Sequence, residues 1–170
     1  MKIIEAMKKL KDLQRKCHDL RNKVAVHCAG LSYETPPYGP EQRKTVEGWV
    51  QSHRDIVQEI ARLRVAIQKT NILTLVTIDF GDKSVTKTIA EWIHRRRDLA
   101  QMDASMVAQL GDRGLKEQRG KDSQGNDVEI KIVRYFDPKV RDELLNEFQS
   151  EPSIIDGRLE VVNAITDLVE

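Results

Sequence analysis

Apolar side chains recur every three or four residues along two long segments in the first half of the chain. In residues 2–27 the recurring positions are Ile3, Ala6, Leu10, Leu13, Cys17, Leu20 and Val24. In residues 41–71 they are Val46, Trp49, His53, Ile56, Ile60, Leu63, Ile67 and Thr70. Alternating steps of three and four keep a narrow apolar stripe on one side of a helix, as in coiled coils. We call these two stripes the seam, and they predict two long helices that pair along it.

The residues between the two segments favour an antiparallel arrangement. Residues 30–40 contain three prolines and two glycines and therefore form a loop. At 1.5 Å per residue, the predicted helices are roughly 39 and 45 Å long. Helices of similar length joined by a short loop are most simply an antiparallel hairpin.

The second half of the chain predicts smaller elements. Residues 73–86 are rich in β-branched side chains around Gly81-Asp82, which indicates a short β-hairpin or an extended connector. A helix is expected over 88–110, followed by a second hairpin in 115–136 with its turn at 122–127. Asp137 and Pro138 then start a helix, with the aspartate as its N-cap. Pro152 is expected to break or kink this helix before a final helix over 153–168.

These elements predict a mainly α protein: a long antiparallel helical hairpin with additional helices and one or two small β-hairpins. We expect one domain over 1–170, with the helical hairpin in 1–73. An insertion of β-hairpin, helix and β-hairpin follows in 74–136, and acidic helices occupy 137–170. Narrow seams leave little core for one subunit, so we expect a homo-oligomer.

Composition excludes several classes of protein. Charged residues make up 32% of the chain and aromatic residues 5%, which suits long solvated helices. We find no run of about 18 apolar residues and no charged-then-apolar leader, and therefore expect neither a membrane span nor a signal peptide. Cys17 and Cys28 have no disulfide or zinc spacing, which favours free thiols in the cytoplasm.

The formal charge of +1 conceals an asymmetry. Residues 142–170 contain eight acids and one base, so they carry −7, and residues 1–141 therefore carry +8. The acidic end can pack against a basic surface of the same subunit or of a neighbour. The alternative is that both surfaces are ordinary solvated faces.

No catalytic or metal motif is present. The four histidines, His18, His27, His53 and His94, form no metal-ligand spacing with one another or with the cysteines. No nucleophile arrangement or glycine-rich phosphate loop stands out. We therefore expect a non-enzymatic protein with no cofactor and no metal.

The best candidate for a binding site is polar and cationic. Its residues are Thr70, Asn71, Trp92, Arg95, Arg96, Arg97 and Arg134. Continuing the three–four stripe of the third helix from Ile89 places Arg96 and Asp103 on its apolar face, together with Trp92, Leu99, Met106 and Leu110. A buried arginine needs a partner. One possibility is that Arg96 pairs with Asp103 or Asp98. The other is that Arg96 faces a solvent-filled cavity that receives an anion. In that case the nearby ring of Trp92 could stack on a base of the ligand.

Binding of a nucleic acid polymer is not expected. The candidate basic residues are Arg95 to Arg97, Lys116, Arg119, Lys121, Lys131, Arg134, Lys139 and Arg141. Successive residues of a helix point about 100° apart, so the three adjacent arginines cannot face one groove. The overall charge is near neutral and no nucleic-acid motif is present.

Several short segments resemble the septicolysin-like family of small, mostly bacterial helical proteins. They are Ile4-Glu5-Ala6 with Leu13-Gln14, the segment 67–71, Arg97-Asp98, the strand 129–132 and the segment 163–168. The resemblance implies a long-helix hairpin that assembles into a closed homo-oligomer, and no enzymatic activity.

Together these observations lead us to expect a homo-oligomer that captures a small anionic, nucleotide-like ligand at a subunit interface. Sequestration of a nucleotide signal would suit such a design. The alternative is a coiled-coil-like assembly scaffold without a ligand.

Overall fold

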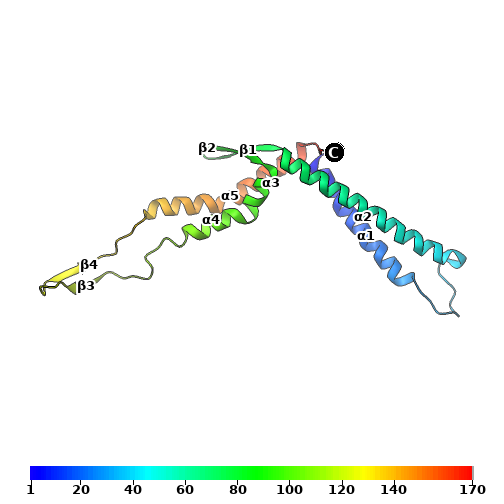
Figure 1. Cartoon of the computed structure of the whole chain (residues 1–170), viewed down its shortest axis with the longest axis horizontal. Coiled ribbons are helices and arrows are strands. Elements are labelled where there is room, and N and C mark those ends of the chain that lie inside the picture. The colour runs from blue at the N-terminus through cyan, green and yellow to red at the C-terminus, as the bar shows by residue number, and fades with distance from the viewer. Residues whose placement is uncertain (170) are drawn as a thin grey trace. The chain divides into compact units, whose positions relative to one another are not determined.

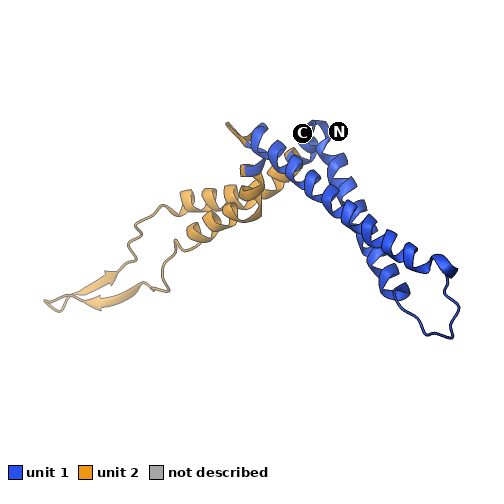
Figure 2. Ribbon diagram, turned by 45° about the vertical axis from the view of Figure 1, so that its right-hand side comes forward, with its two compact units in different colours: residues 1–76, 88–90, 159–170 blue, residues 77–87, 91–158 orange. Residues whose placement is uncertain are grey.

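The computed structural model describes residues 1–169 and divides the chain into two compact units. Unit 1 contains Met1–Val76, Thr88–Ala90 and Leu159–Glu170, and unit 2 contains Thr77–Lys87 and Glu91–Arg158 (Figure 2). The predicted fold class is confirmed: the protein is mainly helical, with two small two-stranded antiparallel sheets (Figure 1).

Helices α1 (Ile3–His27) and α2 (Gln42–Leu73) form the antiparallel hairpin of unit 1 (Figure 1). The loop between them includes the short 3-10 helix η1 (Gly39–Glu41). Lys9 Nζ lies 2.5 Å from Glu59 Oε1 across the pair. At the loop end, Gln42 Nε2 donates a hydrogen bond of 2.7 Å to the carbonyl oxygen of His27.

The seam holds the two helices together as predicted. Every seam position on both helices is buried or half-buried, whereas nearly all positions between them are exposed. Ala6, Leu13 and Leu63 form the centre of this core. Partly buried side chains pack against the centre, namely Leu10, Ile56, Ile60, Ile67 and Leu168. Toward the loop the seam is only half-buried, because two helices alone cannot cover it.

The N-terminal segment and the C-terminal tail are tied together in unit 1. Lys2 and Asp167 form an antiparallel bridge, and Lys2 Nζ donates to Asp167 Oδ2 at 2.7 Å. This hydrogen bond is the main reason that the pKa of Asp167 is lowered. Leu168 N also donates to the carbonyl oxygen of Met1 at 2.8 Å.

Strands β1 (Leu75–Phe80) and β2 (Lys83–Thr88) form the first predicted hairpin. Gly81, in the two-residue turn, has a φ of 61°, a left-handed conformation that glycine adopts without strain. The hydroxyl oxygens of Thr77 and Thr86 lie 2.7 Å apart across the strands.

The predicted third helix is α3 (Ile89–His94), the π-helical segment η2 (Arg95–Leu99) and α4 (Ala100–Val107) in succession. A π-helical turn contains an additional residue, so it shifts the register of every side chain after it. The expected stripe is consequently wrong beyond Arg96. Ala100 and Ala104 are buried, although the stripe had placed Leu99 and Asp103 on the apolar face. The apolar side chains expected on that face beyond Arg96 are exposed, namely Leu99, Met106 and Leu110.

Strands β3 (Gln118–Lys121) and β4 (Asp127–Ile130) form the second predicted hairpin. The carboxylate of Asp122 accepts hydrogen bonds from the backbone of Gln124 and from the backbone and side chain of Asn126. These bonds lower the pKa of Asp122, and the Asn126 side chain is the largest cause.

Helix α5 (Pro138–Ile165) continues through Pro152. The break expected at this proline, and the separate helix over 153–168, are therefore wrong. Glu151 and Ile155, on either side of the proline, are both buried. Their packing holds the backbone helical, although proline cannot donate the usual hydrogen bond. The predicted start is confirmed: Asp137 Oδ1 accepts a hydrogen bond of 2.8 Å from Lys139 N.

Candidate functional site

The most buried cation among the candidate residues is Arg95, which begins η2 in unit 2. Its side chain is 16% exposed and its Nε lies 2.5 Å from Glu151 Oε2 on α5. A second carboxylate, that of Asp103 on α4, accepts a hydrogen bond from Arg95 Nη1. The guanidinium also lies 5.4 Å from the centre of the Phe148 ring. We call Arg95, Asp103 and Glu151 the Arg95 cluster.

The Arg95 cluster joins three helical segments through charge-assisted hydrogen bonds. Such bonds favour the ionised arginine, so the pKa of Arg95 is raised, chiefly by Glu151. Of the two possibilities that the sequence left open, this region therefore shows the ion pair. The register shift in η2 explains why Arg95 pairs with Asp103, although the stripe had assigned Arg96 to that face.

The next two arginines lie in more solvated positions. Arg96 Nη1 donates to Asp156 Oδ1 on α5, and its side chain is 38% exposed. Arg97 is 62% exposed and contacts only residues of its own helix: its Nη2 lies 3.3 Å from Asp98 Oδ2 and 3.2 Å from His94 Nδ1. Of the three, Arg97 is the arginine most open to an external anion.

Trp92 is buried and is not placed to stack on a ligand. Its residue surface is 2% exposed. The centres of the Phe80 and Trp92 rings lie 5.8 Å apart, and Lys87 Nζ lies 5.3 Å from the centre of the Trp92 ring. Trp92 therefore acts in the core of unit 2.

Arg134 fastens the base of the β3–β4 hairpin. Its Nε and Nη2 lie 2.6 and 2.7 Å from the two carboxylate oxygens of Asp112, a bidentate pair. The pair lowers the pKa of Asp112 and raises that of Arg134. Arg141 Nη1 adds a hydrogen bond of 3.0 Å to the carbonyl oxygen of Leu110. No hydrogen bond or ion pair joins Arg134 to residues 95–97 in the described part of the chain.

Thr70 and Asn71 belong to unit 1, whereas the arginines belong to unit 2. Thr70 is fully buried; its Oγ1 donates to the carbonyl oxygen of Ala66 at 2.8 Å and accepts from Val169 N at 2.9 Å. It therefore fixes the C-terminal tail against α2. Among residues 1–169, no hydrogen-bond donor reaches the buried Oδ1 atom of Asn71.

Acids of the C-terminal region form ion pairs with bases of the same chain. Its acids that pair with distant bases are Glu147 with Lys83, Glu151 with Arg95, Asp156 with Arg96, and Asp167 with Lys2. The basic residues left without an ion pair among residues 1–169 are consequently concentrated on the α1–α2 hairpin, and include Lys11, Arg54, Arg62, Arg64 and Lys69.

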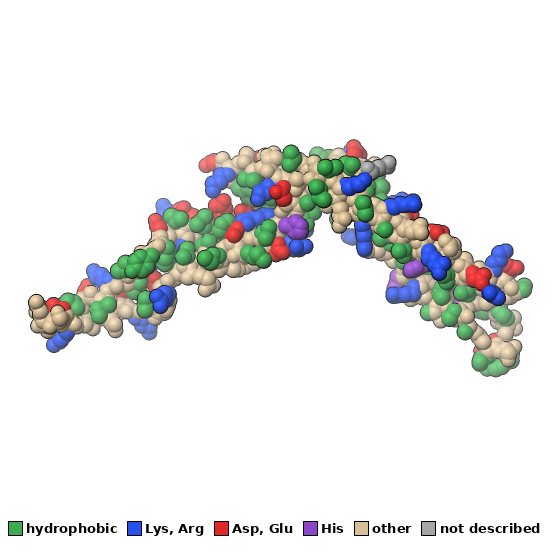
Figure 3. Space-filling model, in the orientation of Figure 1, with side chains coloured by type: hydrophobic (Ala, Val, Ile, Leu, Met, Phe, Trp, Pro, Cys, Tyr) green, Lys and Arg blue, Asp and Glu red, His purple; other side chains and the backbone are tan. Residues whose placement is uncertain are grey.

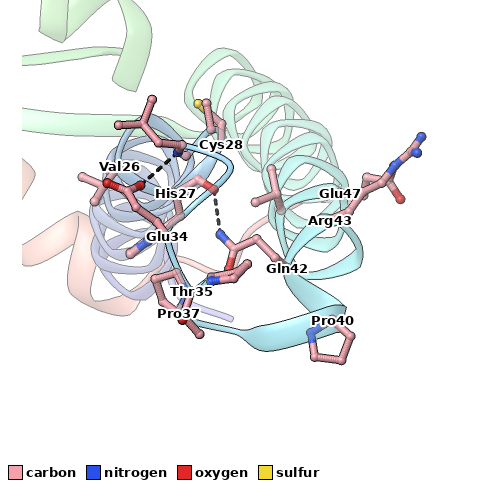
Figure 4. A pocket seen from close by; sticks show the side chains of 15 residues that line it. Val26, His27, Cys28, Glu34, Thr35, Pro37, Pro40, Gln42, Arg43 and Glu47 are labelled. Carbon is pink, nitrogen blue, oxygen red and sulfur yellow. Dashed lines mark hydrogen bonds and ion pairs between the residues drawn. The ribbon is translucent and has the colours of Figure 1, made fainter.

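Hollows open along the surface of unit 1. A pocket of about 670 Å³ lies under the α1–α2 loop, where Gln42 reaches the His27 carbonyl and Arg43 points outward (Figure 4). A shallower groove of about 990 Å³ runs along α2 and is lined chiefly by apolar surface. Its lining residues include Leu63, Val65, Ala66 and Leu168, with Asp55, Arg62 and Lys69 at its rim.

Sequence reasoning missed an aromatic cluster beside the loop. The rings of His27, Tyr38 and Trp49 lie within 5.3 to 5.8 Å of one another, and Lys23 Nζ lies 5.9 Å from the Trp49 ring. The signal was the seam itself, which includes Trp49 near the start of α2, opposite the end of α1. The partners Glu151 and Asp156 were also missed, since no local spacing connects them to residues 95–97.

Among residues 1–169, no group of three His, Cys, Asp or Glu side chains is arranged to hold a metal ion. None of the helices in this part of the chain is both long and apolar enough to cross a membrane.

Comparison with protein-family models matches residues 10–168 to a family of unknown function, DUF6847. No curated protein and no solved structure matches the chain. The resemblance to the septicolysin-like family is therefore wrong. The segments that suggested it are two to six residues long and consist of common helix and strand residues, so they carry little information about family. Because the match covers nearly the whole sequence, the chain belongs to the DUF6847 family.

Proposed function

We propose that this protein is a non-enzymatic assembly protein that works as a homo-oligomer built through its α1–α2 hairpin. The observation that carries the proposal is the groove along α2, whose apolar floor is uncovered. Val65 in this groove is 52% exposed. A groove of this kind gains stability when a second helix covers it.

The charges beside the groove suit a second copy of the same chain. They lie on the flank formed by residues of α1 and α2 that directly precede a seam residue, which we call the mixed flank. It carries five acids and five bases: Glu5, Asp12, Asp19, Asp55, Glu59, Lys9, Lys16, Lys23, Arg62 and Lys69. An antiparallel pair of α2 helices related by a two-fold axis near Arg62 would place Asp55 of each copy opposite Lys69 of the other. Such an interface is self-complementary, as a two-fold dimer requires.

The arginines of unit 2 also support assembly over ligand capture. Arg95, Arg96 and Arg134 already contact carboxylates of the same chain. Anion binding at these residues would first require breaking an internal ion pair. Their contribution is therefore to hold helices and the β3–β4 hairpin in place.

The experiment is a mass measurement of the purified chain by light scattering during size-exclusion chromatography. We expect a multimer for the native sequence and a single subunit for Val65→Glu, because the added charge would be buried in the interface. Gln68→Glu is the control, since it makes the same change of charge on the opposite flank of α2 and should leave the multimer intact. A native chain that elutes as a single subunit at micromolar concentration would refute the proposal.

Capture of a small anionic, nucleotide-like ligand at a subunit interface is the second candidate. The observation that favours it is the exposed Arg97, which has only acidic and imidazole contacts longer than 3 Å. Native mass spectrometry, followed by denaturation, would detect a retained phosphate-containing molecule. Arg97→Ala should abolish retention, whereas Arg43→Ala, which removes an even more exposed arginine, should not. If no molecule is retained and no nucleotide of a panel raises Tm, ligand capture is refuted and the assembly proposal is the one that stands.

A further inference from the structure

The two flanks of the α1–α2 hairpin differ in charge. The residues that directly follow a seam residue form a second flank, which we call the cationic flank. Its bases are Lys11, Arg21, Arg54 and Arg64, and its apolar members are Ile4, Met7, Ala25, Val50, Val57 and Ala61. Its acid, Glu47, is already paired with Arg43 at 2.8 Å. The cationic flank therefore carries a charge of +3, whereas the mixed flank has no net charge. The other bases in excess on the two helices, Lys8, Arg15, Arg43 and Lys44, lie outside both flanks.

Both helices contribute to the same side of the hairpin. An apolar groove of about 260 Å³ lies there, lined by Leu20, Arg21, Val24, Val50, His53 and Arg54. Arg21 and Val50 come from opposite helices, and each directly follows a seam residue. The contact between Lys9 and Glu59, which precede seam residues, marks the other side. In Figure 3 hydrophobic side chains lie at the surface of the hairpin between lysines and arginines.

Apolar side chains on this flank remain open to solvent. Ile4, Met7, Val50 and Val57 are 45, 42, 38 and 47% exposed, respectively. They follow the same three–four spacing as the seam, so they form a stripe that side chains of another helix can enter. The stripe therefore has the form of a site for a helix.

The bases of the flank lack counter-charges. Lys11, Arg54 and Arg64 form no ion pair among residues 1–169, and the guanidinium of Arg21 contacts only His18, at 3.0 Å. A second copy docked through the same flank would bring four bases against four bases, which is unfavourable. The acids of α5 do not supply the missing charge either, because most of them are paired within their own chain.

We infer that the cationic flank binds an acidic amphipathic helix of another protein. Its apolar side enters the stripe around Val50 and Val57, and its carboxylates pair with Arg21, Arg54 and Arg64. Binding modes of this kind combine a helix in an apolar groove with charge complementarity. The inference is separate from homo-oligomerisation, which uses the mixed flank.

The test uses a synthetic peptide of about three heptads with Leu at a and d and Glu at e and g. Its binding to the full chain is followed by fluorescence anisotropy. The same peptide with Lys in place of Glu is the comparison, and it should not bind. Raising the salt from about 50 to 500 mM should weaken binding of the acidic peptide, since screening reduces the charge pairing.

Variants of the protein locate the binding surface. Arg54→Glu with Arg64→Glu should raise Kd for the acidic peptide by at least about tenfold, because two attractions become repulsions. The matched control is Lys8→Glu with Arg15→Glu, which makes the same change of charge on the outer side of α1 and should leave Kd within about twofold. Val57→Gln tests the apolar contribution and should weaken binding without changing its salt dependence.

Two other anionic partners are alternative outcomes. Vesicles of phosphatidylglycerol and a single-stranded DNA oligonucleotide are tested against the same variants. Binding of either probe that depends on Arg54 and Arg64, without binding of the acidic peptide, would overturn the inference. Equal loss of peptide binding in the control variant would overturn it as well. The multimer mass, measured in parallel, separates this result from any failure of assembly through the mixed flank.

Discussion

Removal of one charge from the Arg95 cluster should destabilise unit 2. The replacement Glu151→Gln keeps the size and shape of the side chain and removes only its negative charge. Glu151 is buried, with 11% of its side chain exposed, and its main partner Arg95 is 16% exposed. The guanidinium would then retain Asp103 but lose the charge of Glu151, its more buried partner.

The magnitude follows from these burials. Breaking a fully buried pair costs about 3–5 kcal/mol. Because Arg95 retains Asp103 and glutamine can still accept a hydrogen bond, we expect about 2 kcal/mol here. In a chain of this size, each kcal/mol lowers Tm by about 2–4 °C, so the expected loss is about 4–8 °C.

The assay exploits the two tryptophans, since Trp49 lies in unit 1 and Trp92 in unit 2. In a Trp49→Phe background, the fluorescence of Trp92 reports urea unfolding of unit 2. Glu143→Gln is the control because Glu143 is 66% exposed and lies 4.0 Å from Lys139. It should change the unfolding free energy by less than about 0.5 kcal/mol.

A double replacement separates charge from packing. Arg95→Met with Glu151→Met removes both charges and should recover most of the stability lost in Glu151→Gln, since buried pairs are often replaceable by apolar side chains. If Glu151→Gln left the urea midpoint unchanged, the reasoning that this ion pair holds α5 to η2 would be refuted.

Three further changes test other parts of the structure. Thr70→Val should cost about 1–2 kcal/mol, because the amide of Val169 loses its acceptor, and hydrogen exchange of that amide should accelerate. Pro152→Ala should stabilise the protein by about 1–3 kcal/mol in thermal unfolding, since it restores a helical hydrogen bond inside α5; destabilisation would show that the helix requires the proline. Asp112 has a pKa lowered by Arg134, so its pairing contributes stability above the unfolded aspartate pKa of about 3.9 and loses it as the pH falls through the lowered pKa. NMR signals of the β3–β4 hairpin should follow that acid transition, and Asp112→Asn should abolish it.

The helical hairpin could be predicted because the pattern that specifies it lies in residues close together in the sequence. Each seam residue is three or four positions from the next, and the structure buries or half-buries all of them. The same argument failed in the third helix, where η2 inserts one residue into the turn. Periodicity assumes a constant number of residues per turn, so it cannot detect such an insertion. Leu99, expected inside, is therefore 43% exposed, and the adjacent Ala100 is buried.

The candidate site depends on contacts that local spacing cannot supply. An arginine near position 96 that needed a carboxylate partner was predictable from the cost of burying a charge. Its identity as Arg95 required the register of η2, and the partner Glu151 lies 56 residues further along the chain. Pro152 was misjudged for a similar reason, since the buried neighbours that keep α5 continuous are tertiary contacts.

The wide turn at Arg95–Leu99 holds one residue more than an ordinary α-helical turn. If it tightened to ordinary α-helix with its sequence unchanged, every later side chain would rotate by about 100° about the helix axis. Leu99 and Met106 would then replace Ala100 and Ala104, which are 0 and 3% exposed, against the interior. Deletion of one residue within the turn should instead remove the extra residue and leave both alanines buried, so a deletion that would ruin any other part of this helix should be tolerated here.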